Sequence, residues 1–301
     1  MSQDIHQSSQ YGQYMRKIGW MVKKIDNCQI FIRQFPLIGS FIKIQRLSFP
    51  IPLKKIEKLT QRHRAFKIII EPRKTEKLRN EEIEKLRNFG YQKSNSPYLP
   101  TRTIQIDLRK SEKEIFKNFS EAKRRGVKKA IKNGVIIKPS KDIKSFIRIK
   151  SSQFLFLGFL IKKDINALWQ TFSPKNAVLL RARSKYRPSR EIPLMISFRR
   201  CSNNNFLAGI LLLFHYQTAH YWLAASTKRG NRLFAPSFLV WEALKLAKKR
   251  GAKIFDFEGI YDPRFHQATK SWQGLTRFKK GFGGKETEYP GCFVKQHLGR
   301  F

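Results

Sequence analysis

Apolar and polar residues are arranged along this chain in two alternating patterns. Short apolar runs rich in β-branched and aromatic residues predict strands, and apolar residues that recur every three or four positions predict helices. Because the two kinds of segment alternate, we expect an α/β or α+β fold. The predicted strands are 29–35, 40–47, 65–70, 101–108, 177–182, 206–214, 218–224 and 254–257, and the predicted helices are 6–20, 52–63, 76–88, 112–132, 145–160, 237–250 and 274–282.

The length of the chain, 301 residues, indicates two domains, since single hydrophobic cores usually serve roughly 100 to 200 residues. Hydrophobic residues at 41% are sufficient to build both cores. We expect residues 1–100 together with 290–301 to form the first domain and residues 101–289 the second.

Positive charge dominates the composition. The chain has 62 Lys and Arg against 21 Asp and Glu, a formal net charge of +41. Such a field suits a polyanion, namely RNA, a phosphate-bearing substrate or an anionic membrane surface. The excess is spread along the whole chain, so charge alone does not choose among these partners.

One predicted helix concentrates this charge in ten residues that contain no acid. Without a polyanion nearby its cations would repel one another, so we expect this face to meet tRNA or membrane phosphates. The residues leave open which of the two it meets. The cations are Lys123, Arg124, Arg125, Lys128, Lys129 and Lys132.

Cysteine usage and apolar run lengths bear on the compartment. Cys28, Cys201 and Cys292 are an odd number without CxxC spacing, so neither a disulfide framework nor a zinc site is indicated. The start of the chain does not read as a secretory signal, and the apolar runs at 154–161 and 206–214 are too short to cross a bilayer. We expect a cytoplasmic protein whose membrane contact is at most peripheral.

Ionisable residues elsewhere give no sign of a metal site. His215 and His220 lie near predicted strand ends without HExxH or other ligand spacing, so we expect both to be structural histidines and no metal to be bound.

Candidate chemistry gathers near the C-terminus. The predicted strand 254–257 is followed by a polar loop and a short helix over 274–282, on which Leu275, Phe278 and Phe282 are expected to share one apolar face. That face would hold Arg277, Lys279 and Lys280 on a rigid turn, as a cation requires if it is to meet a developing negative charge. The alternative is a solvated basic turn above a Phe-filled core.

The residues DFEGI (256 onward), GLTRFKKGFGG (274 onward) and EYPGCF (288 onward) occur here in an order that resembles the C-terminal signature of the Fem family. These enzymes transfer an amino acid from aminoacyl-tRNA to a peptidoglycan precursor. The resemblance implies that Lys279 stabilises the tetrahedral intermediate, with Phe278 beside it. One departure is visible: the family usually has Gly where this chain has Glu258.

Weaker matches extend the resemblance toward the N-terminus, through Gln7-Ser8, Tyr11 and Gly19-Trp20. By position, it implies that Lys162 and Arg16 contact precursor phosphates and that Glu71, before Pro72, accepts the amine proton. An edge-of-strand surface Glu is the other interpretation of Glu71. The family fold is two tandem GNAT-like domains with mixed sheets flanked by helices, and the compact form without a coiled-coil arm fits best.

The implied reaction moves an amino acid from aminoacyl-tRNA to the stem-peptide amine of a UDP-linked or lipid-linked precursor, without a cofactor and by a monomer. One rival on the same fold is a CoA-dependent N-acyltransferase, although bulky Arg232, Leu233 and Phe234 stand where such enzymes have a Gly-rich loop. The other rival is a non-catalytic RNA-binding or membrane-binding protein.

Overall fold

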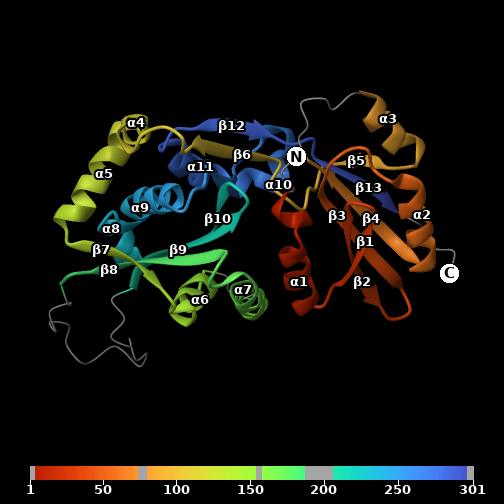
Figure 1. The fold of residues 1–301 in the computed structure, drawn as a ribbon, viewed down its shortest axis with the longest axis horizontal. Coiled ribbons are helices and arrows are strands. Elements are labelled where there is room, and N and C mark those ends of the chain that lie inside the picture. The colour runs from red at the N-terminus through yellow and green to blue at the C-terminus, as the bar shows by residue number, and fades with distance from the viewer. Residues whose placement is uncertain (1–3, 74–79, 154–157, 187–205, 297–301) are drawn as a thin grey trace.

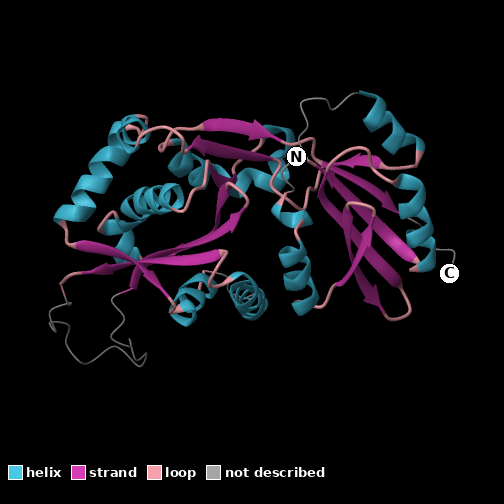
Figure 2. Ribbon diagram, viewed as in Figure 1, coloured by secondary structure: helices cyan, strands magenta, loops and turns pink. Residues whose placement is uncertain are grey.

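Two mixed β-sheets lie side by side in the computed structural model, and helices cover their faces (Figures 1 and 2). The structure describes residues 4–73, 80–153, 158–186 and 206–296. The predicted α/β architecture with mixed sheets flanked by helices is confirmed.

The first sheet combines residues before 95 with a strand from the C-terminal end of the chain. Its six strands have the order β1-β2-β3-β4-β13-β5, and all neighbours are antiparallel except β3 and β4. The strands are β1 (Met21–Ile25), β2 (Cys28–Phe35), β3 (Gly39–Leu47), β4 (Ala65–Pro72), β5 (Gln92–Ser94) and β13 (Cys292–Gln296).

The second sheet repeats this plan with a single parallel pair, β10 and β11, and the order β12-β6-β11-β10-β9-β8-β7. β9 is buried along almost its whole length because helices cover both faces of the sheet, which explains its unbroken apolar run. The strands are β6 (Arg102–Asp107), β7 (Val135–Ser140), β8 (Ala177–Ser184), β9 (Phe206–His215), β10 (Thr218–Ser226), β11 (Ile254–Gly259) and β12 (Lys285–Glu288).

Three apolar clusters hold the layers together. One packs α4, α5, α9 and α11 on one face of the second sheet, another packs α1, α6 and α7 on its opposite face, and the third packs α2 and α3 on the first sheet. The α-helices are α1 (Ser9–Lys17), α2 (Leu53–Arg62), α3 (Asn80–Asn88), α4 (Glu112–Lys117), α5 (Glu121–Lys132), α6 (Ile143–Ser151), α7 (Gly158–Phe172), α8 (Lys228–Arg232), α9 (Ala235–Lys249), α10 (His266–Thr269) and α11 (Gln273–Lys280), and the 3₁₀ helices are η1 (Ile5–Gln7), η2 (Pro263–Phe265) and η3 (Lys270–Trp272).

Helix α1 joins the two halves. Tyr11 and Met15 are buried, and they pack in the same cluster as Phe31 of the first sheet and Phe146 of α6. Figure 1 shows α1 between α7 and the first sheet. The N-terminal segment therefore fixes the second half of the molecule against the first.

Several predicted elements differ from the structure. The prediction of a single helix over 112–132 is wrong, because this segment forms two helices, α4 and α5. Ser120 accepts a hydrogen bond from the Lys123 amide and so caps the start of α5. Ala122, in the first turn of α5, is exposed. The helix over 145–160 is also α6 and α7, and a helical turn, α8, occupies part of the predicted loop before α9. The expected domain limits stay a prediction.

None of the helices in the described ranges combines the length with the apolar character that a membrane span needs.

Candidate active site

The site forms where β10 and β11 part. Their parallel pairing runs from Thr218 and Ile254 to His220 and Asp256. Beyond it, β10 has a register irregularity against β9 at Tyr221, and the pairing of β11 with β6 shifts register between Asp256 and Gly259. Separated strands leave side chains and backbone carbonyls of both strands available for chemistry.

Lys279 of α11 reaches into this opening. Its side chain is buried at 3% exposure, and its Nζ donates a hydrogen bond of 2.6 Å to the carbonyl oxygen of Gly259 at the end of β11. Burial lowers the pKa of Lys279 to about 8. The charge of Lys150 also lowers this pKa, whereas the carboxylates of Glu258 and Asp256 raise it. A buried, held ammonium of this kind can stabilise an oxyanion.

The apolar face predicted for the helix that carries Lys279 is confirmed for Phe278 and Phe282 and is wrong for Leu275. Leu275 is 42% exposed, whereas Thr276 and Lys279 form the buried face. The apolar anchor consists of buried Phe282 and half-buried Phe278, whose rings pack edge to face. The helical repeat of so short a segment does not determine which of its residues face the core. The packing beneath the helix determines this.

Lys123 connects α5 to this turn. Its Nζ lies 3.9 Å from the centre of the Phe278 ring, and the Ser120 amide donates to the carbonyl oxygen of Gly281. Burial lowers the pKa of Lys123, which has a cation–π contact in place of full hydration. The predicted polyanion residue Lys123 therefore packs against the turn that carries Phe278 and Lys279.

The other predicted polyanion residues divide between two roles. Arg124 donates to the carbonyl oxygens of Lys117 and Phe119 and so closes the break between α4 and α5. The remaining cations lie exposed along α5, although Arg125 makes an ion pair of 3.3 Å with Glu121. The exposed residues are Arg125, Lys128, Lys129 and Lys132.

A group of buried ionisable residues lies beside Lys279, and the sequence did not predict that they meet. His220 Nδ1 is 2.7 Å from Glu258 Oε1, and Asp256 accepts hydrogen bonds from Thr103, Gln105 and the Glu258 amide. The pKa of Asp256 is raised by burial and by the neighbouring charge of Glu258. The signal in the sequence was polar Asp256 and Glu258 inside an apolar strand.

Two cavities lie on opposite faces of β10. The larger, about 830 Å³, is lined by His220, Asp256 and Tyr289 among others, and the smaller, about 330 Å³, by Tyr221 and Phe278 among others. Lys279 Nζ lies 5.6 Å from the Tyr221 ring centre. Lys279 itself lines neither cavity, but its neighbours Tyr221 and Phe278 both line the smaller one.

Glu71 lies at the end of β4 in the first sheet and is buried at 2% exposure, so the interpretation as an exposed surface Glu is wrong. Its Oε1 accepts hydrogen bonds from the amides of Tyr98 and Leu99, while Oε2 has no partner among the described residues. Its role as proton acceptor stays a prediction.

Lys162 and Arg16 are both exposed, on α7 and α1. The two helices lie together in the structure, since Gln10 near the start of α1 donates to the carbonyl oxygen of Thr171 near the end of α7. Lys162 stands in the first turns of α7 rather than after the end of a helix, which the sequence led us to expect. Their contact with phosphate stays a prediction.

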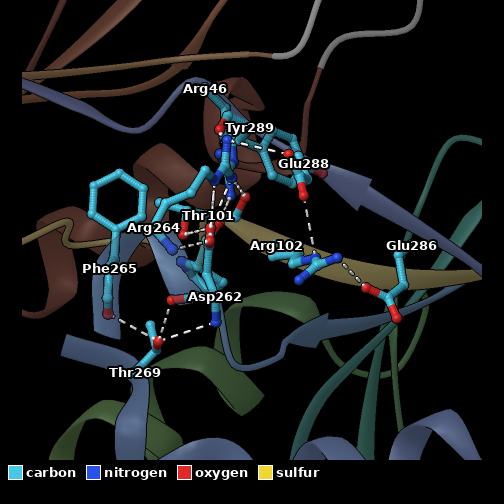
Figure 3. Close-up of polar contacts among 11 residues, drawn as sticks. Arg46, Thr101, Arg102, Asp262, Arg264, Phe265, Thr269, Glu286, Glu288 and Tyr289 are labelled. Carbon is cyan, nitrogen blue, oxygen red and sulfur yellow. Dashed lines mark hydrogen bonds and ion pairs between the residues drawn. The ribbon is translucent and has the colours of Figure 1, made fainter. Parts of the chain in front are cut away.

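A network around Asp262 fixes the loop that leads from β11 to α11 (Figure 3). Asp262 is fully buried, accepts a hydrogen bond of 2.6 Å from Thr101 Oγ1 and makes an ion pair of 2.7 Å with Arg264. Thr269 Oγ1 accepts from the Asp262 amide. The loop is therefore tied to the start of β6 before the chain enters α11.

Within the described ranges, no cluster of three or more His, Cys, Asp or Glu side chains could hold a metal ion. Cys28 and Cys292 are buried free thiols, and burial raises the pKa of each to about 12.

Comparison with known proteins gives one family. Residues 189–297 match the model described as the FemAB family. An 89-residue segment is 30% identical to the aminoacyltransferase FemA of Staphylococcus aureus and covers 29% of this chain and 20% of that protein. The chain therefore matches only a fifth of the length of this curated relative.

The fold has relatives over nearly the whole chain. The crystal structure of FemX superposes with a TM-score of 0.74 at 16% identity and covers 98% of this chain and 93% of that one. A tandem GNAT protein from the clavulanic acid biosynthesis pathway superposes with a TM-score of 0.54 at 7% identity, covering 89% and 82% of the two chains. The expected tandem GNAT-like architecture is confirmed.

Proposed function

We propose, from the premise that this chain belongs to the FemAB family, that it is an aminoacyltransferase that moves an amino acid from aminoacyl-tRNA to the stem-peptide amine of a peptidoglycan precursor. The observation that carries the proposal is the buried ammonium of Lys279, held by the Gly259 carbonyl beside Tyr221, which lines the smaller cavity. An activated ester attacked by an amine needs positioning, removal of a proton and stabilisation of an oxyanion.

Each of these requirements has a candidate in the chain. Lys279 stabilises the oxyanion, and Phe278 keeps its helix in place. The smaller cavity, which Phe278 lines, receives the aminoacyl ester, and the larger cavity receives the acceptor amine. Lys162 and Arg16 contact the precursor phosphates. The Lys162 ammonium acts as a point charge, and the planar Arg16 guanidinium can donate two parallel hydrogen bonds.

The rival that uses CoA is less well supported. Acyl-CoA enzymes of this fold need a loop whose backbone amides approach a pyrophosphate. Here α8 fills that position, and the Gly230 backbone is packed so closely that an added Cβ would lie 2.1 Å from the Leu207 carbonyl oxygen. Saturable binding of an acyl-CoA, together with no turnover of aminoacyl-tRNA, would favour that rival.

The function is tested by incubating the protein with charged total tRNA and a panel of UDP-linked and lipid-linked precursors, followed by mass analysis of the acceptor. A mass increment on one precursor identifies the amino acid and the acceptor together. RNA binding that weakens with salt, without transfer to any precursor, would instead support a non-catalytic binding protein.

The exposed basic face of α5 is expected to contribute to tRNA binding. Replacing Lys128, Lys129 and Lys132 with Gln should weaken tRNA binding and reduce the slope of log K against log salt by about 0.7 to 0.9 for each phosphate that the variant no longer neutralises. The side chains are exposed, so stability should be unchanged. Fluorescence titrations at several salt concentrations measure the slope.

Lys54, Lys55 and Lys58 of α2 provide a matched control, since replacing them removes the same charge from the other half of the molecule. An equal loss of tRNA affinity in both triple variants would show that only net charge matters. An unchanged affinity for tRNA in the α5 variant, with binding to anionic vesicles abolished, would assign this face to membrane phosphates.

A further inference from the structure

His220 of β10 is held in one orientation at the wall of the larger cavity. It is 9% exposed and lines that cavity, and its Nδ1 lies 2.7 Å from Glu258 Oε1. Within the described part of the chain, no hydrogen bond reaches its Nε2. When Nδ1–H donates to the carboxylate, Nε2 carries the lone pair and is free to accept a proton.

Glu258 is itself fixed by the backbone. Its φ of 57° lies in the left-handed region, which a Glu seldom occupies, and its amide donates to Asp256 Oδ1 at 2.8 Å. Asp256 is held in turn by Thr103 Oγ1 at 2.5 Å and Gln105 Nε2 at 2.7 Å. The turn therefore directs the Glu258 carboxylate at His220 and costs backbone strain that the surroundings must offset.

The same turn holds Lys279. Glu258 precedes Gly259, whose carbonyl oxygen accepts the hydrogen bond from Lys279 Nζ. Neighbouring residues of β11 thus hold the imidazole on one side and the ammonium on the other. A proton acceptor and an oxyanion stabiliser fixed on one rigid strand end are the two groups that attack on an ester requires.

Resting on the proposed aminoacyl transfer, we propose that His220 is the catalytic residue that accepts the proton of the attacking amine, and that Glu258 is its positioning residue. The acceptor amine reaches from the larger cavity, between the parted strands, to the ester carbonyl carbon on the side of the smaller cavity. The new C–N bond forms as the amine proton passes to His220 Nε2. The tetrahedral oxyanion collapses, the bond from carbon to the tRNA ribose oxygen breaks, and the imidazolium returns the proton to that oxygen.

The surrounding charges suit this role. Burial acts against the imidazolium, yet the hydrogen bond and charge of Glu258, with Asp256 and Asp4, raise the pKa of His220 above its usual value. Asp4 and His6 face Glu258 from the N-terminal segment, and Lys150 of α6 faces Lys279. Transfer should therefore rise with pH as His220 loses its proton and fall as Lys279 loses its own near pH 8.

The first test replaces the base. In the His220→Gln variant, kcat should fall roughly a hundredfold at pH 7 with little change in KM. The acid limb that follows the pKa of His220 should disappear, which leaves only the rise caused by ionisation of the acceptor amine. His63→Gln, at the end of α2, is the matched control and should keep the wild-type profile. Thermal unfolding checks that each variant is folded.

The second test leaves His220 in place. In Glu258→Gln, both limbs of the profile should move to lower pH, since the carboxylate that favours the charged forms of His220 and Lys279 is removed. A purely structural role of Glu258 would reduce activity without moving either limb. Glu71→Gln is measured in parallel, because Glu71 is the competing proton acceptor.

The outcomes separate the two proposals. An active wild type whose acid limb is unchanged in His220→Gln, or is altered only in Glu71→Gln, overturns the inference about His220 and leaves the transferase function standing. A wild type that transfers no amino acid to any acceptor overturns both.

Discussion

Replacing Lys279 with Ala should lower turnover at saturating substrates by roughly a hundredfold or more, the scale on which one oxyanion donor acts. The ammonium is buried and held by the Gly259 carbonyl, so water cannot easily supply an equivalent donor in the same geometry. Steady-state transfer from aminoacyl-tRNA measures the effect. Lys279→Met, which keeps most of the side-chain volume, separates the loss of charge from the loss of packing.

Lys280 offers the matched control for this experiment. It follows Lys279 on the same helix, but its side chain is 52% exposed and forms an ion pair of 2.7 Å with Glu286. Lys280→Ala should retain nearly full activity. Wild-type turnover in both Lys279 variants would remove Lys279 from the mechanism.

Replacing Asp262 with Ala should lower the free energy of unfolding by about 3 kcal/mol, at the low end of the range for breaking a buried ion pair. The low end is expected because Arg264 is 38% exposed and keeps Glu288 as a second partner at 3.3 Å. Most of the loss comes from the unpaired Thr101 hydroxyl and the void left behind. Urea unfolding at pH 7 measures the change.

The pKa of Asp262 determines how this loss of stability varies with pH. The burial of Asp262 alone would raise its pKa, but hydrogen bonds from Arg264 and Thr101 prevail and hold the pKa below its usual value. The contribution of Asp262 is therefore complete above about pH 4 and is lost as the pH falls through the folded-state value. The difference between wild type and Asp262→Ala should shrink in acid.

Asp26 is the control for Asp262. It makes an ion pair of the same length, 2.7 Å with Lys55, but its side chain is 52% exposed. Asp26→Ala should change stability by at most about 1 kcal/mol, because solvent screens the pair. Equal losses in the two variants would contradict the view that burial of Asp262 makes its network important.

Much of this fold could be predicted from the sequence because its signals are local. The apolar run of β9, the capping box at Ser111 and Glu114, and the inward positions of α1 each depend on a few neighbouring residues. The short strands β1, β5, β12 and β13 were not predicted. Each of them is only three to five residues long, which is too short for a clear sequence pattern. They are stabilised by pairing with strands that are distant in the sequence.

The sequence by itself determined that Lys279 follows Phe278 on a short helix near the C-terminus, and that strands and helices alternate before it. Only the tertiary structure decided that Lys279 is buried, that Leu275 is exposed, and that His220, Glu258 and Asp256 meet. The physical reason is that a helix of two turns has no unique apolar face until a core lies beneath it. Residues from β6, β10, β11 and α11 come together only where two strands part. These elements are far apart in the sequence, so no local sequence pattern predicts that they meet.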